Sequence, residues 1–230
     1  MTTRTRTPAR RTTRPAARTE KPSRRPPQQD RGQKRYEAVL DAAERVIAEV
    51  GVEAMTTNAV AARAGAGMGS LYHFFADKNA IVVALAERYT SAMRPLTEYA
   101  RQPELPRLPV ADMTDAIVDP LVAFFHSAPA YRHVWHAVNQ PGSQSAFQCD
   151  LQESVVKSVS AMVSARVPRV SAKRLRVFAL AAVEMVHGML STAFSAPPAD
   201  RQALIGETKR MLALYAEMIE TGDDPLERLR

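Results

Sequence analysis

The sequence predicts an all-α protein with a small N-terminal domain of three helices and a larger C-terminal helical domain. Apolar residues recur at the spacing of one helical face through most of the chain beyond residue 33. No stretch alternates between apolar and polar residues as a half-buried strand does. Glycines and prolines separate the periodic segments. At 230 residues, the chain can bury a core in one large domain or in two modest ones.

Residues 1–32 are predicted to form a disordered basic arm. The first 35 residues hold 12 Lys and Arg against Glu20 and Asp30, and they contain five prolines but no Val, Ile, Leu, Phe, Trp or Tyr. Without apolar side chains, a segment cannot offset by burial the entropy that it loses on ordering. The arm also accounts for the net charge of +7. Two roles stay open for it: contact with DNA phosphates regardless of sequence, and that of a solubilising tail.

Residues 33–50 predict the first helix, because their apolar positions fall on one face. Gly51 follows the last periodic residue, as is typical of the left-handed position after a helix. The hydroxyls of the Thr56-Thr57 pair suit the N-cap of a two-turn helix over residues 58–64.

A glycine-rich turn over residues 65–70 ends this second helix. Residues 71–75 can form only a short third helix, and Asp77 is predicted to cap a longer fourth one. Pro95 should kink or end the fourth helix, and three prolines make residues 102–110 a loop.

The helical period returns beyond this loop. It predicts helices over residues 117–125, 131–138, 151–163, 171–195 and 200–221, the last of them capped by Asp200. The mostly apolar run 177–196 carries Glu184 and His187, so it predicts a buried helix rather than a membrane span. The expected domains are the arm 1–32, the three-helix domain 33–82, the larger helical domain 83–222 and a tail 223–230.

The last predicted helix is apolar on two sides. One stripe consists of Leu204, Met211, Tyr215 and Met218, and the other of Ile205, Leu212 and Ile219. A terminal surface helix needs only one such stripe. The second is most simply covered by the same helix in another copy of the chain, related by a two-fold axis. We therefore predict a homodimer, with Leu212 and Ile219 in its interface.

Two short helices joined by a glycine-bearing turn behind a longer helix form a helix-turn-helix, whose second helix enters the DNA major groove. Gly69 and Ser70 leave the start of that helix open to a phosphate or a base edge. The rings of Tyr72 and His73 can each bind a phosphate oxygen. Packing against the first helix is the alternative for both Tyr72 and His73.

Lys78 stands in the first turn of the fourth helix, where the helix dipole disfavours a cation. A DNA phosphate at this helix start would reverse that penalty. The alternative for Lys78 is a solvated charge. Thr57 is expected to act first as an N-cap and only second as a phosphate contact.

Three motifs define this segment: Thr56-Thr57-Asn58-Ala59-Val60-Ala61-Ala62-Arg63-Ala64-Gly65, Gly67-Met68-Gly69-Ser70-Leu71-Tyr72-His73-Phe74-Phe75 and Asp77-Lys78. They resemble the DNA-binding domain of TetR-family transcriptional regulators over residues 35–82. The resemblance implies an all-helical homodimer of about nine helices per subunit, with a small-molecule pocket in the C-terminal domain. Ligand binding would change the separation of the two DNA-reading heads. The family's DNA-contacting positions carry over to Thr57, Met68, Gly69, Ser70, Tyr72, His73 and Lys78.

The C-terminal domain offers a candidate pocket for a small apolar or amphipathic effector. Apolar, aromatic and imidazole side chains could line it, namely Phe124, Phe125, Trp135, Met162, Met185, His187 and Met189. Ordinary core packing is the alternative for most of them. Glu184 and His187 lie three residues apart on an apolar helix, so burial would require a partner for each.

The sequence gives little support for nucleotide binding, catalysis or metal binding. The Gly65–Gly69 stretch follows a helix, whereas a dinucleotide-binding loop follows a strand, and no phosphate-binding loop, nucleophile elbow or zinc-protease motif occurs. His133 and His136 share a helical face but have no Cys or carboxylate at ligand spacing. We therefore expect no catalytic site, no metal and no cofactor. The single cysteine, Cys149, fits a reducing, cytoplasmic compartment.

The function predicted from these features is that of a ligand-responsive, sequence-specific DNA-binding regulator. It would repress from a palindromic operator and be released by a small molecule, without a membrane partner. The alternative is a non-specific architectural or adaptor protein that binds DNA through its basic arm. Salt dependence separates the two, because binding through the arm alone would ignore sequence and weaken steeply with salt.

Overall fold

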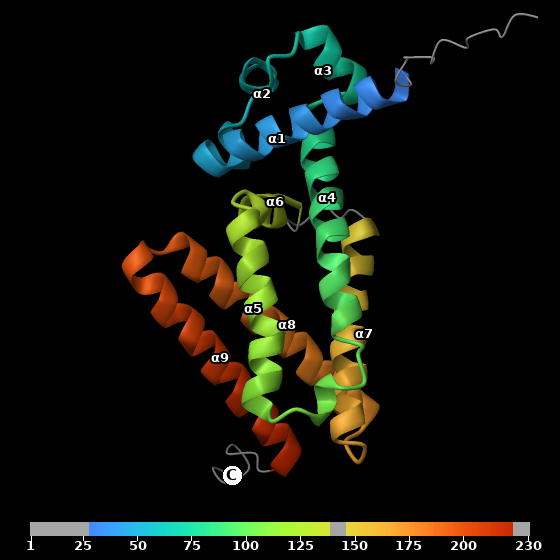
Figure 1. The fold of residues 1–230 in the computed structure, drawn as a ribbon, viewed down its shortest axis with the longest axis vertical. Coiled ribbons are helices and arrows are strands. Elements are labelled where there is room, and N and C mark those ends of the chain that lie inside the picture. The colour runs from blue at the N-terminus through green and yellow to red at the C-terminus, as the bar shows by residue number, and fades with distance from the viewer. Residues whose placement is uncertain (1–27, 139–145, 223–230) are drawn as a thin grey trace, which may run out of the picture.

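The computed structural model describes residues 28–138 and 146–222. Within these ranges the chain forms nine α-helices and one short 3-10 helix, and no strand (Figure 1). The elements are α1 (Gln28–Ala54), α2 (Thr57–Ala64), α3 (Met68–Phe74), α4 (Lys78–Tyr99), η1 (Leu105–Arg107), α5 (Val110–Ser127), α6 (Tyr131–Val138), α7 (Ala146–Arg166), α8 (Ala172–Ser195) and α9 (Pro198–Thr221). The all-α prediction is confirmed.

Helix α1 begins at Gln28, so residues 28–32 are helical and do not belong to a disordered arm. Apolar periodicity could not reveal this start, because the added residues are polar or small and bury no apolar stripe. Gln and Arg are good helix formers, whereas Asp30 and Gly32 are poor ones, so residue type alone does not mark this start either. The rest of the predicted arm, residues 1–27, and the predicted tail at 223–230 lie outside the described residues.

The ends of α1 and α2 are set by local signals. Gly51 has a φ of 77° and interrupts α1 at the predicted place, although helical backbone resumes up to Ala54. Thr56 is the N-cap of α2, and its hydroxyl accepts a hydrogen bond from the amide of Ala59 at 3.1 Å. Thr57 is the first helical residue, so the expectation that it acts as the cap is wrong. Gly65 ends α2 in the left-handed conformation.

Helix α3 starts at Met68, earlier than residue 71, because the amides of Ser70 and Leu71 both donate to the carbonyl of Gly67. Its inner face is held on α1. Leu71 is fully buried there, and the ring of Phe75 stacks on that of Tyr36 with centroids 5.0 Å apart. These contacts fix which side of α3 faces outward.

Helix α4 is continuous from the N-terminal domain into the C-terminal bundle (Figure 1). Asp77 caps it as predicted, accepting from the amide of Ala80 at 2.8 Å. Pro95 does not end it, and the helix runs on to Tyr99. A proline inside a helix costs about 3 kcal/mol, which the packing of a long amphipathic helix can outweigh. The expected boundary between residues 82 and 83 therefore falls inside one helix.

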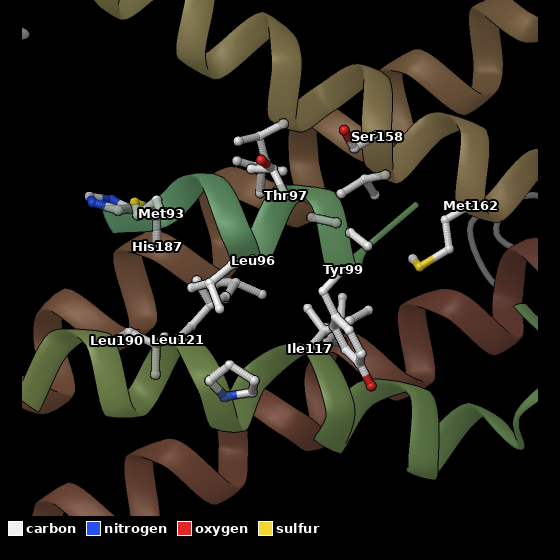
Figure 2. A pocket seen from close by; sticks show the side chains of 18 of the residues that line it. Met93, Leu96, Thr97, Tyr99, Ile117, Leu121, Ser158, Met162, His187 and Leu190 are labelled. Atoms are coloured by element: carbon white, nitrogen blue, oxygen red, sulfur yellow. The ribbon is translucent and has the colours of Figure 1, made fainter. Parts of the chain in front are cut away.

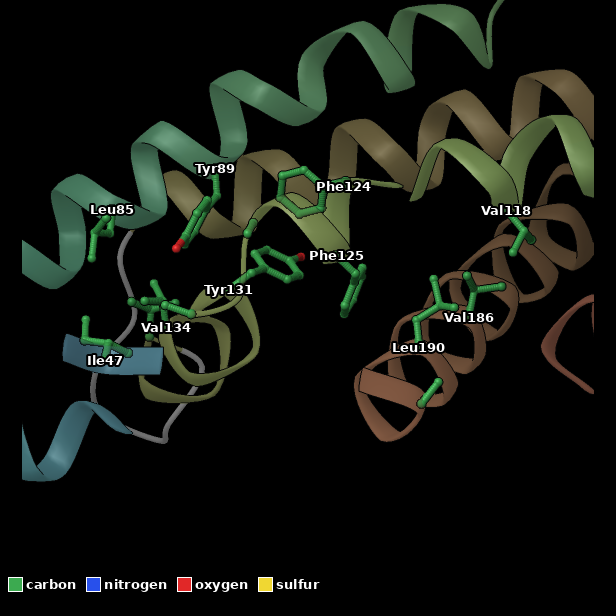
Figure 3. Close-up of a cluster of buried hydrophobic side chains, with 14 of the residues drawn as sticks. Ile47, Leu85, Tyr89, Val118, Phe124, Phe125, Tyr131, Val134, Val186 and Leu190 are labelled. Atoms are coloured by element: carbon green, nitrogen blue, oxygen red, sulfur yellow. The ribbon is translucent and has the colours of Figure 1, made fainter. Parts of the chain in front are cut away.

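One apolar core joins the two domains (Figure 3). Ile47 of α1, Leu85 of α4 and Val134 of α6 meet below the helix-turn-helix, and the cluster continues to Phe125 of α5 and Leu190 of α8. Polar contacts reinforce the junction. The guanidinium of Arg88 on α4 donates to the carboxylates of Asp41 and Glu44 on α1, and the Tyr89 hydroxyl also donates to Glu44, at 2.8 Å. The middle of α4 is thus tied to α1.

Helices α8 and α9 form a hairpin at the edge of the bundle (Figure 1). Among the described residues, only α8 is long and apolar enough to cross a membrane, with a mean hydropathy of 1.6. In the fold it packs against α5, α7 and α9. Its Ser171 cap accepts from the amide of Arg174. Helix α9 begins at Pro198, so Asp200 lies in the first turn and does not cap it. Proline suits this start because its fixed φ is already helical.

Candidate nucleic-acid interface and internal cavity

Helix α3 presents Tyr72 to the outside. The side chain is 52 % exposed, and its hydroxyl lies 3.5 Å from that of Thr57 at the start of α2. The alternative that Tyr72 packs against α1 is therefore wrong. The two hydroxyls, from the two helices of the helix-turn-helix, form a joint polar site of the kind that binds a phosphate oxygen.

The first turn of α3 is open on its outer side. A Cβ added to Gly69 would meet no atom of the chain within 4 Å, so no internal contact requires glycine there. His73 is exposed beside it, whereas Ser70 is half-buried. Met68 packs partly against the core. On the outer surface of α3, Tyr72 and His73 therefore project from the helix, whereas Gly69 has no side chain. The space above Gly69 leaves room for a nucleic-acid backbone.

Lys78 has a partner inside the chain. Its Nζ donates to the carbonyl oxygen of Glu53, near the end of α1, at 2.8 Å. The alternative of a freely solvated charge is therefore wrong. The ammonium group keeps two further N–H donors. The carboxylate of Asp77 already occupies the start of α4, so Lys78, rather than the free amides of the helix, would meet a phosphate.

An internal cavity of about 150 Å³ lies among α4, α5, α7 and α8 (Figure 2). Of the seven residues predicted to line a pocket, four lie on its wall, namely Phe125, Trp135, Met162 and His187. Phe124 does not, because its ring packs edge-on against those of Tyr89 and Tyr131 in the core. Met185 and Met189 are half-buried on α8 but outside the cavity wall.

Sequence reasoning missed the α4 side of the cavity. Met93, Leu96, Thr97 and Tyr99 line it from this helix, and Leu96 faces Leu121 of α5 across the space (Figure 2). The apolar spacing of these residues was visible in the sequence. The kink or end expected at Pro95 hid the continuity of these residues with the rest of the helix.

His187 is the buried polar group of greatest chemical interest in the cavity. Its ring lies 4.5 Å from that of Trp135, and its Nε2 has no hydrogen-bond partner. Burial lowers the pKa of His187 from 6.5 to about 4, so the imidazole is neutral near pH 7. Glu184, by contrast, is exposed, and its carboxylate accepts from Gln152 at 2.7 Å.

The low pKa of His187 makes stability depend on pH. Between pH 6.5 and 4 the unfolded chain binds a proton at this position that the folded chain does not bind, so acidification through this window favours unfolding. The loss is at most about 3 kcal/mol. We expect His187→Phe to reduce the pH dependence by up to this amount, measured as urea unfolding free energy at pH 7 and pH 4.5. An identical pH dependence in both proteins would contradict the assignment.

The dimer residues predicted on α9 face the core of the single subunit. Leu212 and Ile219 are 9 % and 5 % exposed within a single subunit, because their stripe covers the core. Little of either side chain is therefore left for a second copy to contact. The exposed apolar side chains of this hairpin are instead Val177 and Leu180 on α8 and Met211 and Leu214 on α9. Of the other predicted stripe, Met211 is exposed, whereas Leu204 and Tyr215 pack partly against the core.

Metal ligands are not assembled within the described part of the chain, where no three His, Cys, Asp or Glu side chains converge. The ring of His133 lies near Gly51 rather than at a ligand cluster. Cys149 lies in α7, and its side chain falls outside the described residues.

Comparison with known proteins agrees with this architecture. Residues 39–85 match the family described as "Bacterial regulatory proteins, tetR family", and residues 109–215 match "Tetracyclin repressor-like, C-terminal domain". The HTH-type transcriptional regulator YvdT of Bacillus subtilis, itself uncharacterised, is 38 % identical over 61 residues. These are 26 % of this chain and 30 % of that protein.

Solved structures extend the similarity along the chain. A TetR-family transcriptional regulator from Streptomyces coelicolor is 26 % identical, with a TM-score of 0.56 over 80 % of this chain and 99 % of its own. A TetR-like regulator from Rhodococcus sp. RHA1, at 14 % identity, shares the fold with a TM-score of 0.62 over 82 % of this chain and 97 % of its own. Both halves of the chain match the same family, and the chain therefore belongs to the TetR family of transcriptional regulators.

Proposed function

We propose that the protein is a cytoplasmic repressor that acts as a homodimer on a palindromic operator and is released by a small apolar or amphipathic effector. The observation that carries this proposal is the course of α4. Its first half is tied to α1 of the DNA-binding domain, through Lys78 in the first turn and Arg88 near the middle, and its last turns line the cavity. A ligand that displaces the end of α4 would therefore move the DNA-binding domain.

The proposed DNA contacts are Thr57, Met68, Gly69, Ser70, Tyr72, His73 and Lys78. Their exposure supports Gly69, Tyr72 and His73 most directly, since Met68 lies partly in the core. No catalytic role and no cofactor are part of the proposal. The rival function is non-specific DNA binding through the basic arm.

Fluorescence anisotropy across a salt series tests the proposal, using DNA from upstream of the gene and scrambled DNA. We expect a preference of about 10³ or more for one sequence near physiological salt. If upstream DNA shows none, selection from random DNA follows. A protein that still selects no sequence and loses its affinity steeply with salt would be the non-specific binder.

Removing one hydroxyl tests the α3 surface. We expect Tyr72→Phe to lower affinity about fivefold to tenfold on operator and scrambled DNA alike, because a hydrogen bond to a charged phosphate is lost. Tyr99→Phe is the matched control, since it removes a phenol hydroxyl in the other domain and should leave DNA affinity unchanged. Equal affinities for both variants and the wild type would show that Tyr72 does not contact DNA.

A further inference from the structure

The wall of the cavity is apolar over most of its length. Leu96, Ile117, Leu121 and Leu190 face it from three helices (Figure 2). Cavities of about 150 Å³ with such walls stay dry and take apolar molecules of about the size of benzene. The body of the ligand is therefore small and apolar.

Two polar atoms on this wall are buried and have no hydrogen-bond partner, His187 Nε2 and Thr114 Oγ1. Two other hydroxyls of the wall, those of Ser158 and Thr97, are satisfied within the chain. The Ser158 hydroxyl accepts from Arg101 and donates to the carbonyl of Ser154, and the Thr97 hydroxyl donates to the carbonyl of Arg94. A buried polar atom without a partner is costly, and a ligand that supplies the partner removes this cost.

The two atoms lie at different ends of the cavity. His187 adjoins Phe125, with ring centroids 5.9 Å apart, and Thr114 precedes Phe125 on α5 by three helical turns, or about 16 Å. One small ligand cannot satisfy both. His187 is the better candidate for a ligand contact, because three aromatic rings surround it. Those of Trp135, Tyr131 and Phe125 all lie within 6 Å of its own.

The charges around the cavity oppose an anionic ligand. Among its described lining residues there is no Lys or Arg, and the one charged side chain is that of Glu184. Burial and the Glu184 carboxylate both raise the pKa of Tyr131, so its phenol stays neutral. A carboxylate in this site would lose its hydration without gaining a cation. The Glu184 carboxylate is exposed and bound to Gln152, which leaves the interior without an anion for an ammonium group.

We propose that the effector is a small uncharged molecule with an apolar body and a hydroxyl group that pairs with His187 Nε2. This inference rests on the proposed function, since it specifies the effector of that regulator. A neutral imidazole nitrogen is either a donor or an acceptor, and a hydroxyl can serve both. The aromatic rings around His187 then enclose the carbon next to the hydroxyl.

Trp135 gives a direct readout, because it is the single tryptophan of the chain and lines the cavity next to His187. The full-length protein at pH 7.5, without DNA, is titrated with cyclohexanol, methylcyclohexane, cyclohexanecarboxylate and cyclohexylamine. We expect saturable changes in Trp135 emission with cyclohexanol at an affinity at least about tenfold above that for the carboxylate and the amine. Cyclohexanol should also bind more tightly than methylcyclohexane.

Two variants locate the hydroxyl. We expect His187→Phe to abolish the preference for cyclohexanol over methylcyclohexane, and Thr114→Val, which removes the other vacant polar atom, to retain it. Three results would overturn the inference: carboxylate binding as tight as that of the alcohol, no saturable binding of cyclohexanol, or an unchanged preference in His187→Phe. A protein that binds cyclohexanol as expected but selects no operator would instead contradict the proposed function alone.

Discussion

Leu214→Glu on α9 is expected to separate the proposed dimer into monomers and to lower operator affinity by about 100-fold or more. Leu214 is 65 % exposed in the subunit and lies on the same hairpin as the exposed Val177, Leu180 and Met211. A two-fold axis through this face would pack the same apolar patch against itself. The substitution would then bury two unpaired carboxylates in one interface. Operator affinity falls as well, because the second DNA-binding domain is no longer tethered to the first.

Leu212→Glu is the matched control, since it places the same charge in the same helix on the inner side. Leu212 is 9 % exposed within the subunit, so this variant should unfold or lose several kcal/mol of stability, about 3 or more. Light scattering gives the mass, and circular dichroism at 25 °C gives the helix content. A Leu214→Glu protein that keeps both its helix content and its dimer mass would place the interface elsewhere.

The helix-turn-helix could be predicted closely from sequence because its signals are local. The cap at Asp77 and the positive φ at Gly51 and Gly65 follow from residue type within a few positions of the helix end. The same reasoning failed between Thr56 and Thr57. Both hydroxyls suit a cap, and only the backbone shows that Thr56 is the one with extended geometry.

The larger domain could be predicted only in part, because its decisive contacts join distant segments. Periodicity found both apolar stripes of α9, but which stripe is internal depends on where α5 and α8 lie. Pro95 was a local signal to kink or end a helix. The packing of α4 along the bundle outweighs the cost of this proline, and the helix continues past it. The cavity was the least predictable part, since the α4 residues of its wall lie on both sides of this proline.

Lys78 connects the proposed DNA-binding surface to the end of α1. Its bond to the Glu53 carbonyl joins the start of α4 to the segment after Gly51. A phosphate that binds Lys78 would therefore also stabilise the junction between α1 and α4. DNA binding and the position of α4 are then linked, and a ligand at the far end of α4 acts on the same helix.

Removing residues 1–27 is expected to weaken binding to any DNA without changing sequence preference. The deletion takes away nine Lys and Arg per subunit and leaves α1 intact. If each arm of the proposed dimer neutralises three phosphates, the plot of log affinity against log salt becomes less steep by about 5. The corresponding loss of affinity at about 0.1 M salt is 100-fold or more. The ratio of operator to scrambled DNA should stay within about threefold, because phosphate contacts carry no sequence information.

A chain with the same arm residues in shuffled order separates charge from sequence. We expect the shuffled arm to restore both the affinity and the salt dependence of the wild type, since counterion release depends on the number of charges near the DNA. If the truncated protein binds the operator as tightly as the full chain does, and with the same salt slope, the arm is a solubilising tail. If the truncated protein loses all DNA binding while its helix content is unchanged, α3 does not read an operator by itself, and the basic arm is the main DNA-binding element.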